Sequence, residues 1–227
     1  MVKHILSLIV AGFPLFAGEY IGFGIRMGKY QIEELNSTLA SKGLSIPENP
    51  LEYGGRYYYE NGLIFGLSGF RWKSTVKSES LSIKAVGKSA MVEGGYSIPI
   101  FKRIKTRVFL GAGSRDISLK FIPLLSDVSL DSLLDNPSRT SELYIANFTF
   151  SIAGEVIFPL FHHLYMDIKG GYFYSPYKIS RWKLKDGARL MNPPKIDLSS
   201  PFISLGFVTD IVIDWAIPLP ILLFLIE

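Results

Sequence analysis

The feature that most constrains this chain is a strict alternation of apolar and polar residues, which is clearest between residues 142 and 158. One face of that stretch carries Tyr144, Ala146, Phe148, Phe150, Ile152, Val156 and Phe158. The opposite face carries Asn147, Thr149, Ser151, Ala153 and Glu155. A period of two places successive side chains on opposite faces of a strand, so the pattern predicts half-exposed β-strands. Although 48% of the residues are hydrophobic and only 19% are charged, no run reaches the roughly 20 apolar residues of a spanning helix.

Similar alternation elsewhere predicts an all-β fold with about eight antiparallel strands. The predicted strands are 19–29, 51–59, 62–73, 80–97, 105–117, 142–158, 164–176 and 202–217. Asn61-Gly62 separates the second strand from the third, because Asn-Gly is the strongest short hairpin signal. The alternative is one unbroken strand from Tyr57 to Trp72, which would leave seven strands.

The chain reversals fall into two groups. Asn61, Pro99 and Pro159 mark short reversals on one side, since proline cannot donate to a ladder and belongs where pairing stops. Both ends of the chain lie on that side. The connections on the other side are a short turn near Ser74–Ser78 and three long stretches, around 30–50, 118–141 and 177–201. Short turns on one side and long loops on the other are typical of transmembrane β-barrels.

One predicted strand changes phase. Leu81 and Ile83 are apolar at odd positions, whereas Ala90 and Val92 are apolar at even positions. A β-bulge near Gly87 would re-aim the side chains and account for the change.

Two connections have the pattern of short helices. In 31–42, Ile32, Leu35 and Leu39 share one helical face and Gly43 is a plausible C-cap. That helix would plug the lumen, lie over its mouth or pack on the rim. A second amphipathic turn is expected around 128–134.

The N-terminal segment has the form of a secretory signal. A short basic region with Lys3 precedes an apolar run over 5–16, and small residues follow. The sequence therefore divides into a signal peptide, 1–18, and a barrel, 19–227, with the mature chain starting near Glu19.

The alternating faces favour a membrane barrel over a soluble one. The supposed outer set is large, aromatic and nearly uncharged, whereas the opposing set is rich in Gly and Ser and carries isolated charges of both signs. Aromatic residues gather near strand ends, as in the girdles at the two membrane interfaces. A closed barrel also leaves no unpaired edge in lipid. The alternative is a soluble, periplasmic, lipocalin-like barrel that binds an apolar ligand.

Eight charged residues are predicted to face the lumen. They are Arg26, Arg56, Glu93, Arg107, Glu155, Asp167, Lys169 and Asp210. In a narrow lumen of low dielectric constant, opposite charges must pair. Glu155 and Asp167 should lie on paired strands near Arg26 or Arg107. The set would form either a static ion-paired plug or a gate along an ion path.

On these patterns the chain resembles the small bacterial outer-membrane β-barrel proteins, the general OmpA, OmpX and OmpW-like class. The resemblance implies a lumen filled by polar side chains, contact with outer-membrane lipid, and insertion by the barrel-assembly machinery. Roles in that class range from structural anchoring to narrow pores and adhesion. With an even number of strands, both termini would be periplasmic. The chain departs from the class at its end, because Leu222–Glu227 follows two prolines and is not a final strand closed by an aromatic residue.

Catalytic and cofactor signals are weak. The sequence has no cysteine, which excludes thiol catalysis, disulfides and Cys-ligated metals. The adjacent His162 and His163 point different ways on extended chain and make a poor metal pair, and no phosphate-binding glycine loop is found. Basic residues are scattered, with a net charge of +4, so no nucleic acid is expected as a partner. We expect a non-enzymatic barrel without cofactor or metal, with a structural role or a narrow pore for a small solute or ion. The alternative is an outer-membrane lipid-modifying enzyme.

Overall fold

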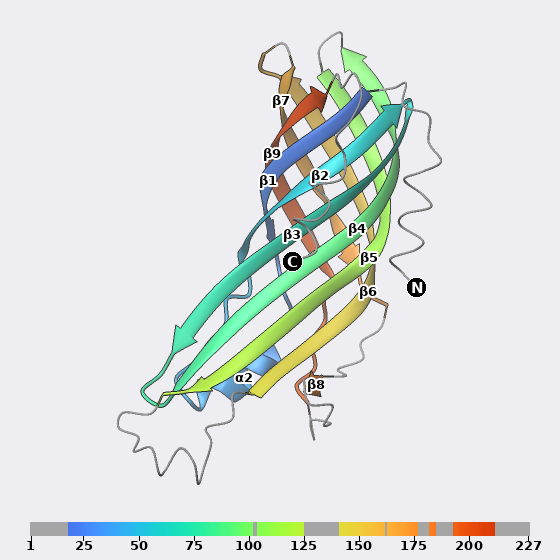
Figure 1. The fold of residues 1–227 in the computed structure, drawn as a ribbon. Helices are drawn as coiled ribbons and strands as arrows, with labels where there is room; N and C mark the ends of the chain where they lie inside the picture. The colour runs from blue at the N-terminus through green and yellow to red at the C-terminus, as the bar shows by residue number, and fades with distance from the viewer. Residues whose placement is uncertain are drawn as a thin grey trace.

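The alternating stretches form one antiparallel sheet that closes on itself (Figure 1). This computed structural model describes residues 18–101, 104–124, 141–161, 163–176, 182–184 and 193–211. The long strands are β1 (Gly18–Gly28), β2 (Leu51–Asn61), β3 (Leu63–Lys77), β4 (Leu81–Phe101), β5 (Ile104–Pro123), β6 (Ser141–Pro159), β7 (Leu164–Tyr174) and β9 (Ser200–Ile211). They neighbour one another in the order β5-β4-β3-β2-β1-β9-β7-β6, and pairing of β5 with β6 closes the barrel. The predicted eight-stranded barrel is confirmed.

Three of the predicted reversals can be placed. The hairpin between β2 and β3 turns at Gly62, whose φ of 72° is the left-handed conformation that glycine tolerates. The alternative prediction of one unbroken strand from Tyr57 to Trp72 is therefore wrong. Pro159 pairs with Tyr165 at the last position before a reversal. Pro99 instead pairs with Lys105, so pairing continues beyond it to Phe101.

At the end of the barrel opposite the short turns, β3 and β5 run further than predicted, whereas β4 and β6 begin within one residue of their predicted bounds. β3 continues to Lys77, so its turn lies at 78–80 and not at Ser74–Ser78. Figure 1 shows these four strands extending together well beyond β1, β2, β7 and β9. We call this part of the sheet the extension.

Burial shows which face looks inward. On β5 and β6, Leu110 and Ile152 are directly paired and point outward, with 65% and 57% of their surfaces exposed. The residues on either side of Ile152 point inward, and Ser151 and Ala153 are only 5% and 4% exposed. The apolar face of the alternation is therefore the outside of the barrel, as in a barrel solvated by lipid.

No β-bulge occurs near Gly87, and that prediction is wrong. β4 pairs with β3 without a shift, Trp72 opposite Gly87, and its odd-numbered residues point inward from Leu81 to Ser97. What changes near Gly87 is the chemistry on each side of the strand. Further along, Glu93 lies inside and Val92 outside, whereas in the extension Ile83 lies inside and Lys84 outside. Position 87 faces inward, and a glycine fits there because the Trp72 ring fills the space that a side chain would need.

The inner face of the extension is covered by an apolar cluster, which we call the cap cluster. Its buried members are Tyr30, Ile32, Leu35, Leu39, Leu44, Ile46, Trp72, Ile83, Ala85, Ile117, Leu119, Ile145, Trp182, Ile196 and Leu198. Leu35 and Leu39 belong to α2 (Glu33–Ala40), which lies at this end of the barrel (Figure 1). Of the three positions expected for the 31–42 helix, the structure shows the one over the mouth of the barrel, with Leu35 and Leu39 packed in the cap cluster.

One short strand lies beside the eight long strands of the barrel. A two-residue strand, β8 (Lys183–Leu184), pairs with β6 beyond the end of β7 and was not predicted. Within the described ranges, no helix is long and apolar enough to cross a membrane. The signal segment before Gly18, the helical turn at 128–134, His162 and the chain after Ile211 lie outside the described residues.

Candidate functional site: the charged barrel interior

The barrel interior collects most of the charged residues predicted to face the lumen. Seven of the eight are at most 4% exposed: Arg26, Arg56, Glu93, Arg107, Glu155, Asp167 and Lys169. They come from β1, β2, β4, β5, β6 and β7, and the alternation of each strand turns them inward. Asp210 lies apart from them near the short-turn end, where its side chain is 23% exposed and bonded to His163.

Arg56 lies at the centre of a group that we call the turn-side cluster. Its two terminal nitrogens donate to Glu155 Oε1 and Asp167 Oδ1, each at 2.6 Å. Glu155 also accepts a hydrogen bond of 3.2 Å from Arg107 Nη1, and Arg107 pairs in turn with Glu60. Glu155 and Asp167 lie on the paired strands β6 and β7, and one guanidinium holds both carboxylates. Arg107 is close, as expected, whereas Arg26 belongs to another group.

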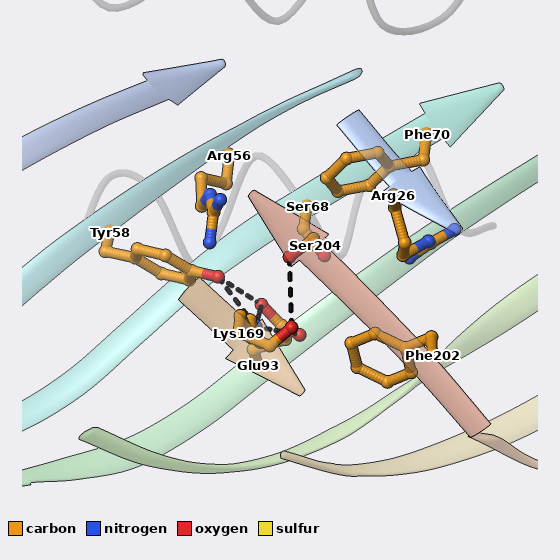
Figure 2. Close-up of a pocket in the computed structure, with 9 residues that line it drawn as sticks. All are labelled: Arg26, Arg56, Tyr58, Ser68, Phe70, Glu93, Lys169, Phe202 and Ser204. Atoms are coloured by element: carbon orange, nitrogen blue, oxygen red, sulfur yellow. Dashed lines mark hydrogen bonds and ion pairs between the residues drawn. The ribbon is translucent and has the colours of Figure 1, made fainter. Parts of the chain in front are cut away.

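A second part of the turn-side cluster surrounds Lys169. Lys169 Nζ lies 2.7 and 2.9 Å from the two carboxylate oxygens of Glu93, and it donates to the Tyr58 hydroxyl at 3.0 Å. The Tyr58 hydroxyl donates to Glu93 Oε2 at 2.6 Å, which closes a three-membered ring of contacts (Figure 2). Lys169 Nζ also sits 4.1 Å from the centre of the Phe109 ring. Such a cation is held by charge, hydrogen bonds and an aromatic face at once.

The cap-side cluster is centred on Glu52, nearer to α2. Arg26 Nε donates to Glu52 Oε2 at 2.6 Å, and the Tyr30 hydroxyl donates to Glu52 Oε1 at 2.6 Å. Arg115 lies 3.8 Å from Glu52 and donates to Ser200 Oγ at 2.9 Å. Burial raises the pKa of the Tyr30 hydroxyl, which lies in the loop after β1, so it stays protonated and keeps donating.

Aromatic rings fill the space between the ion pairs. The Arg26 guanidinium lies 4.3 Å from the centre of the Phe70 ring and 4.8 Å from that of Phe173. Arg115 lies 4.4 Å from the ring of Tyr30 and 4.6 Å from the same Phe173. Planar guanidinium groups stack on aromatic rings, so these cations and rings pack directly against one another.

Several interior residues were missed by the sequence prediction. Glu52 and Arg115 are 1% and 0% exposed, and Glu60 pairs with Arg107. The alternation of each strand could have identified the first two. Glu52 shares its face of β2 with Arg56, and Arg115 shares its face of β5 with Arg107. Both lie near the ends of the predicted strands, where water was expected instead of a covered interior.

The interior contains basic and acidic side chains in similar numbers. The basic members are Arg26, Arg56, Arg107, Arg115 and Lys169. The acidic members are Glu52, Glu60, Glu93, Glu155 and Asp167. Among the described residues these are five cations and five anions, and the part-exposed Lys105 lies 3.6 Å from Glu60 as a further cation. Removing one buried member would leave a partner unpaired at low dielectric constant.

A small cavity remains between the two clusters (Figure 2). Its walls are formed by Arg26, Arg56, Tyr58, Ser68, Phe70, Glu93, Lys169, Phe202 and Ser204. Its volume, about 10 Å³ of space open to the centre of a water molecule, is close to the minimum that holds one water. Gly206 faces the same interior, where a side chain would collide with Arg56 and Asp167. The side chains around this cavity therefore leave a space of about one water molecule between them.

The groups that could bind metal or act in catalysis are sparse. Among the described residues, no group of three or more His, Asp or Glu side chains could hold a metal ion. His163 Nδ1 lies 2.9 Å from Asp210 Oδ1, and Tyr165 donates to Asp210 Oδ2 at 3.4 Å. This rim pair is accessible to water, since the His163 side chain is 56% exposed.

Replacing Tyr58 by phenylalanine tests the ring of contacts around Lys169. The change removes the hydroxyl that links Lys169 to Glu93 and leaves the aromatic packing in place. We expect the free energy of unfolding to fall by about 1–2 kcal/mol, as for one hydrogen bond to a charged group. The measurement is urea unfolding in lipid, followed by tryptophan fluorescence. Tyr53→Phe is the control, because Tyr53 points outward and is 49% exposed. A loss no larger than that of the control would contradict the role of the hydroxyl.

Comparison with known proteins shows which solved structures have a similar architecture. No protein-family model and no curated protein matches the chain. Among solved structures, it is similar to a major outer membrane protein from Thermus thermophilus, with a TM-score of 0.52 and 8% identity over 85% of this chain and 99% of that one. Ail, the attachment invasion locus protein of Yersinia pestis, aligns over 86% of this chain and 100% of its own, with 13% identity and a TM-score of 0.47. Neisserial surface protein A aligns over 85% of this chain and 97% of its own, with 14% identity and a TM-score of 0.44.

Proposed function

We propose that this chain, which has the fold of the small outer-membrane β-barrel proteins, is a closed and non-enzymatic barrel of the outer membrane. In this proposal the barrel anchors the extension of β3–β6 and the cap cluster on the outer side of the membrane. Both chain ends and the short turns then lie on the periplasmic side. The observation that carries the proposal is an interior filled by paired charges inside an apolar outer surface.

The outer surface supports a position in lipid. On β4 the outward residues from Ala90 to Ile98 are apolar or glycine, a stretch of nine residues. Strands of about 9–11 tilted residues suffice to span the hydrocarbon layer. A soluble binder of apolar ligands would need the reverse arrangement, with its apolar face around a cavity, and so the outward position of Leu110 and Ile152 argues against it.

The closed interior favours an anchor over a pore. The turn-side and cap-side clusters follow one another along the barrel axis, and the cap cluster covers the end beyond them. A permeant ion would have to break several buried ion pairs at once, and each is costly to break. The mixed-charge walls are the feature that favours the second candidate, a narrow pore that opens transiently.

An enzymatic role has less support. Lipid hydrolysis by a nucleophile would need an activated serine beside a histidine. In the described part of the chain, His163 Nδ1 is bonded to Asp210, and Tyr165 approaches the same carboxylate. These contacts are those of an ion pair at the barrel rim.

Conductance separates the anchor from the pore. We expect the wild-type protein, inserted into planar lipid bilayers, to give no discrete channel steps. Insertion is verified by the shift in gel mobility on heating, and a porin in the same bilayers serves as the positive control. Reproducible single-channel steps from the purified wild-type protein would contradict the anchor and support the pore.

A further inference from the structure

The outward face of the extension is strongly basic. Its basic residues on β3, β4 and β5 are Arg71, Lys73, Lys77, Lys84, Lys88 and Lys120. The five lysines are exposed. The acidic residues of the same outward rows on β4, β5 and β6 are Asp116 and Glu142. We call these six basic residues the basic face.

Strand register brings like charges together on this face. Arg71 lies directly opposite Lys88, and Lys84 lies directly opposite Lys120. Like charges at directly opposed positions are destabilising. On the other side of these pairs, Asp116 lies directly opposite Lys88 and Glu142 directly opposite Lys120, so each of the two rows carries two cations and one anion. These two rows are separated by the row of Lys73 and Val86, and each keeps one excess positive charge that an anion between its cations would neutralise.

The basic face begins where the apolar surface ends. Along the outward side of β4, Val92 and Ala90 are followed by Lys88, Val86 and Lys84 at successive outward positions. In Figure 1, β3, β4 and β5 run side by side through this region toward their common end. If the apolar surface lies in hydrocarbon, Lys88 and Arg71 are at the depth of the lipid headgroups. Lys84 and Lys120 lie one to two rows above them.

We propose that the basic face binds the phosphate groups of anionic membrane lipids. The inference rests on the proposed position of the barrel in a membrane. Phosphate oxygens between Lys84 and Lys120, and between Arg71 and Lys88, would neutralise both repelling pairs. The apolar neighbours Val86, Ala90 and Val92 would contact the acyl chains of the same lipid, which a soluble anion does not offer.

The test uses the full chain folded in neutral detergent micelles. It is titrated with fluorescent phosphatidic acid, and phosphatidylcholine with the same acyl chains is the uncharged reference. The variant is Lys84→Gln with Lys120→Gln, and the control is Lys29→Gln with Lys42→Gln, two exposed lysines away from the basic face. We expect the K84Q/K120Q protein to bind phosphatidic acid about 30-fold more weakly, at about fivefold for each lysine. The control should change the affinity less than twofold. Binding should also weaken between 0.1 and 1 M salt, as the Debye length falls from about 10 to about 3 Å.

Three results of these titrations would overturn the inference. Equal affinity for phosphatidic acid in the wild type and in K84Q/K120Q would overturn the inference, as would equal affinity for phosphatidylcholine. Lysine-dependent binding of inorganic polyphosphate without binding of phosphatidic acid would show a site for soluble polyanions and overturn the lipid assignment. Failure of the proposed function would be visible separately, as a protein that folds without lipid or detergent.

Discussion

Replacing Arg56 by methionine is expected to lower the free energy of unfolding by about 3–5 kcal/mol, because it leaves two buried carboxylates without their shared cation. Glu155 and Asp167 both bind the Arg56 guanidinium at 2.6 Å, and both are at most 1% exposed. Arg107 still reaches Glu155, but no second cation bonds to Asp167 among the described residues. The measurement is urea unfolding in lipid vesicles, followed by gel mobility without heating.

The matched control for Arg56→Met is Arg71→Met. Arg71 belongs to the neighbouring strand and points outward, where its guanidinium lies 5.7 Å from the ring of Tyr53. Removing it should cost less than about 1 kcal/mol, as is usual for surface substitutions. Combining Arg56→Met with Asp167→Asn and Glu155→Gln should recover part of the loss, because the unpaired charges are then removed. Equal losses for Arg56→Met and Arg71→Met would refute the interior network.

The second large effect is expected on the outer surface. Leu110→Arg should lower the free energy of unfolding in a bilayer by about 2–4 kcal/mol, the cost of a basic residue near the midplane on the lipid face of a barrel. Leu110 is 65% exposed and lies opposite Ile152, near the middle of the apolar stretches of β5 and β6. In a water-soluble barrel, arginine at so exposed a position would cost almost nothing.

Thr75→Arg is the control for Leu110→Arg. Thr75 also points outward, but it lies on the extension opposite Lys84, beyond the apolar surface. Its replacement should lower the unfolding free energy by less than about 1 kcal/mol in the same vesicles, the cost of one more pair of like charges at opposed positions. If both variants are equally tolerated, the outer surface of the barrel is not in hydrocarbon.

Strand number and facing could be predicted from the sequence because both depend on local alternation. A period of two determines which residues share a face, and Ile152 lies outside and Ser151 inside as the alternation predicts. The same rule failed near Gly87, where it predicted a β-bulge that the structure does not have. There the outside changes from apolar to charged and the inside from polar to apolar, so the apolar set moves from even to odd positions without any bulge.

The partners within the interior could not be read from the chain. Arg56 and Glu155 are 99 positions apart, and their contact depends on the stagger of all the strands between them. Glu52 and Arg115 were missed since the apolar cover over them comes from loops and α2, which place Tyr30 and Leu198 against the strand ends. Parity determines that a charge faces inward, whereas tertiary structure determines which opposite charge it meets.

The most direct test of the membrane-embedded barrel is the accessibility of spin labels in vesicles. The sequence has no cysteine, so single labels can be placed cleanly by Leu110→Cys, Ile152→Cys and Lys120→Cys. Collisions with oxygen, which partitions into hydrocarbon, are compared with collisions with a water-soluble nickel chelate. The account predicts that labels at 110 and 152 meet oxygen and are shielded from nickel, and that a label at 120 shows the reverse. A label at 110 that is as accessible to nickel as the label at 120 would contradict the account.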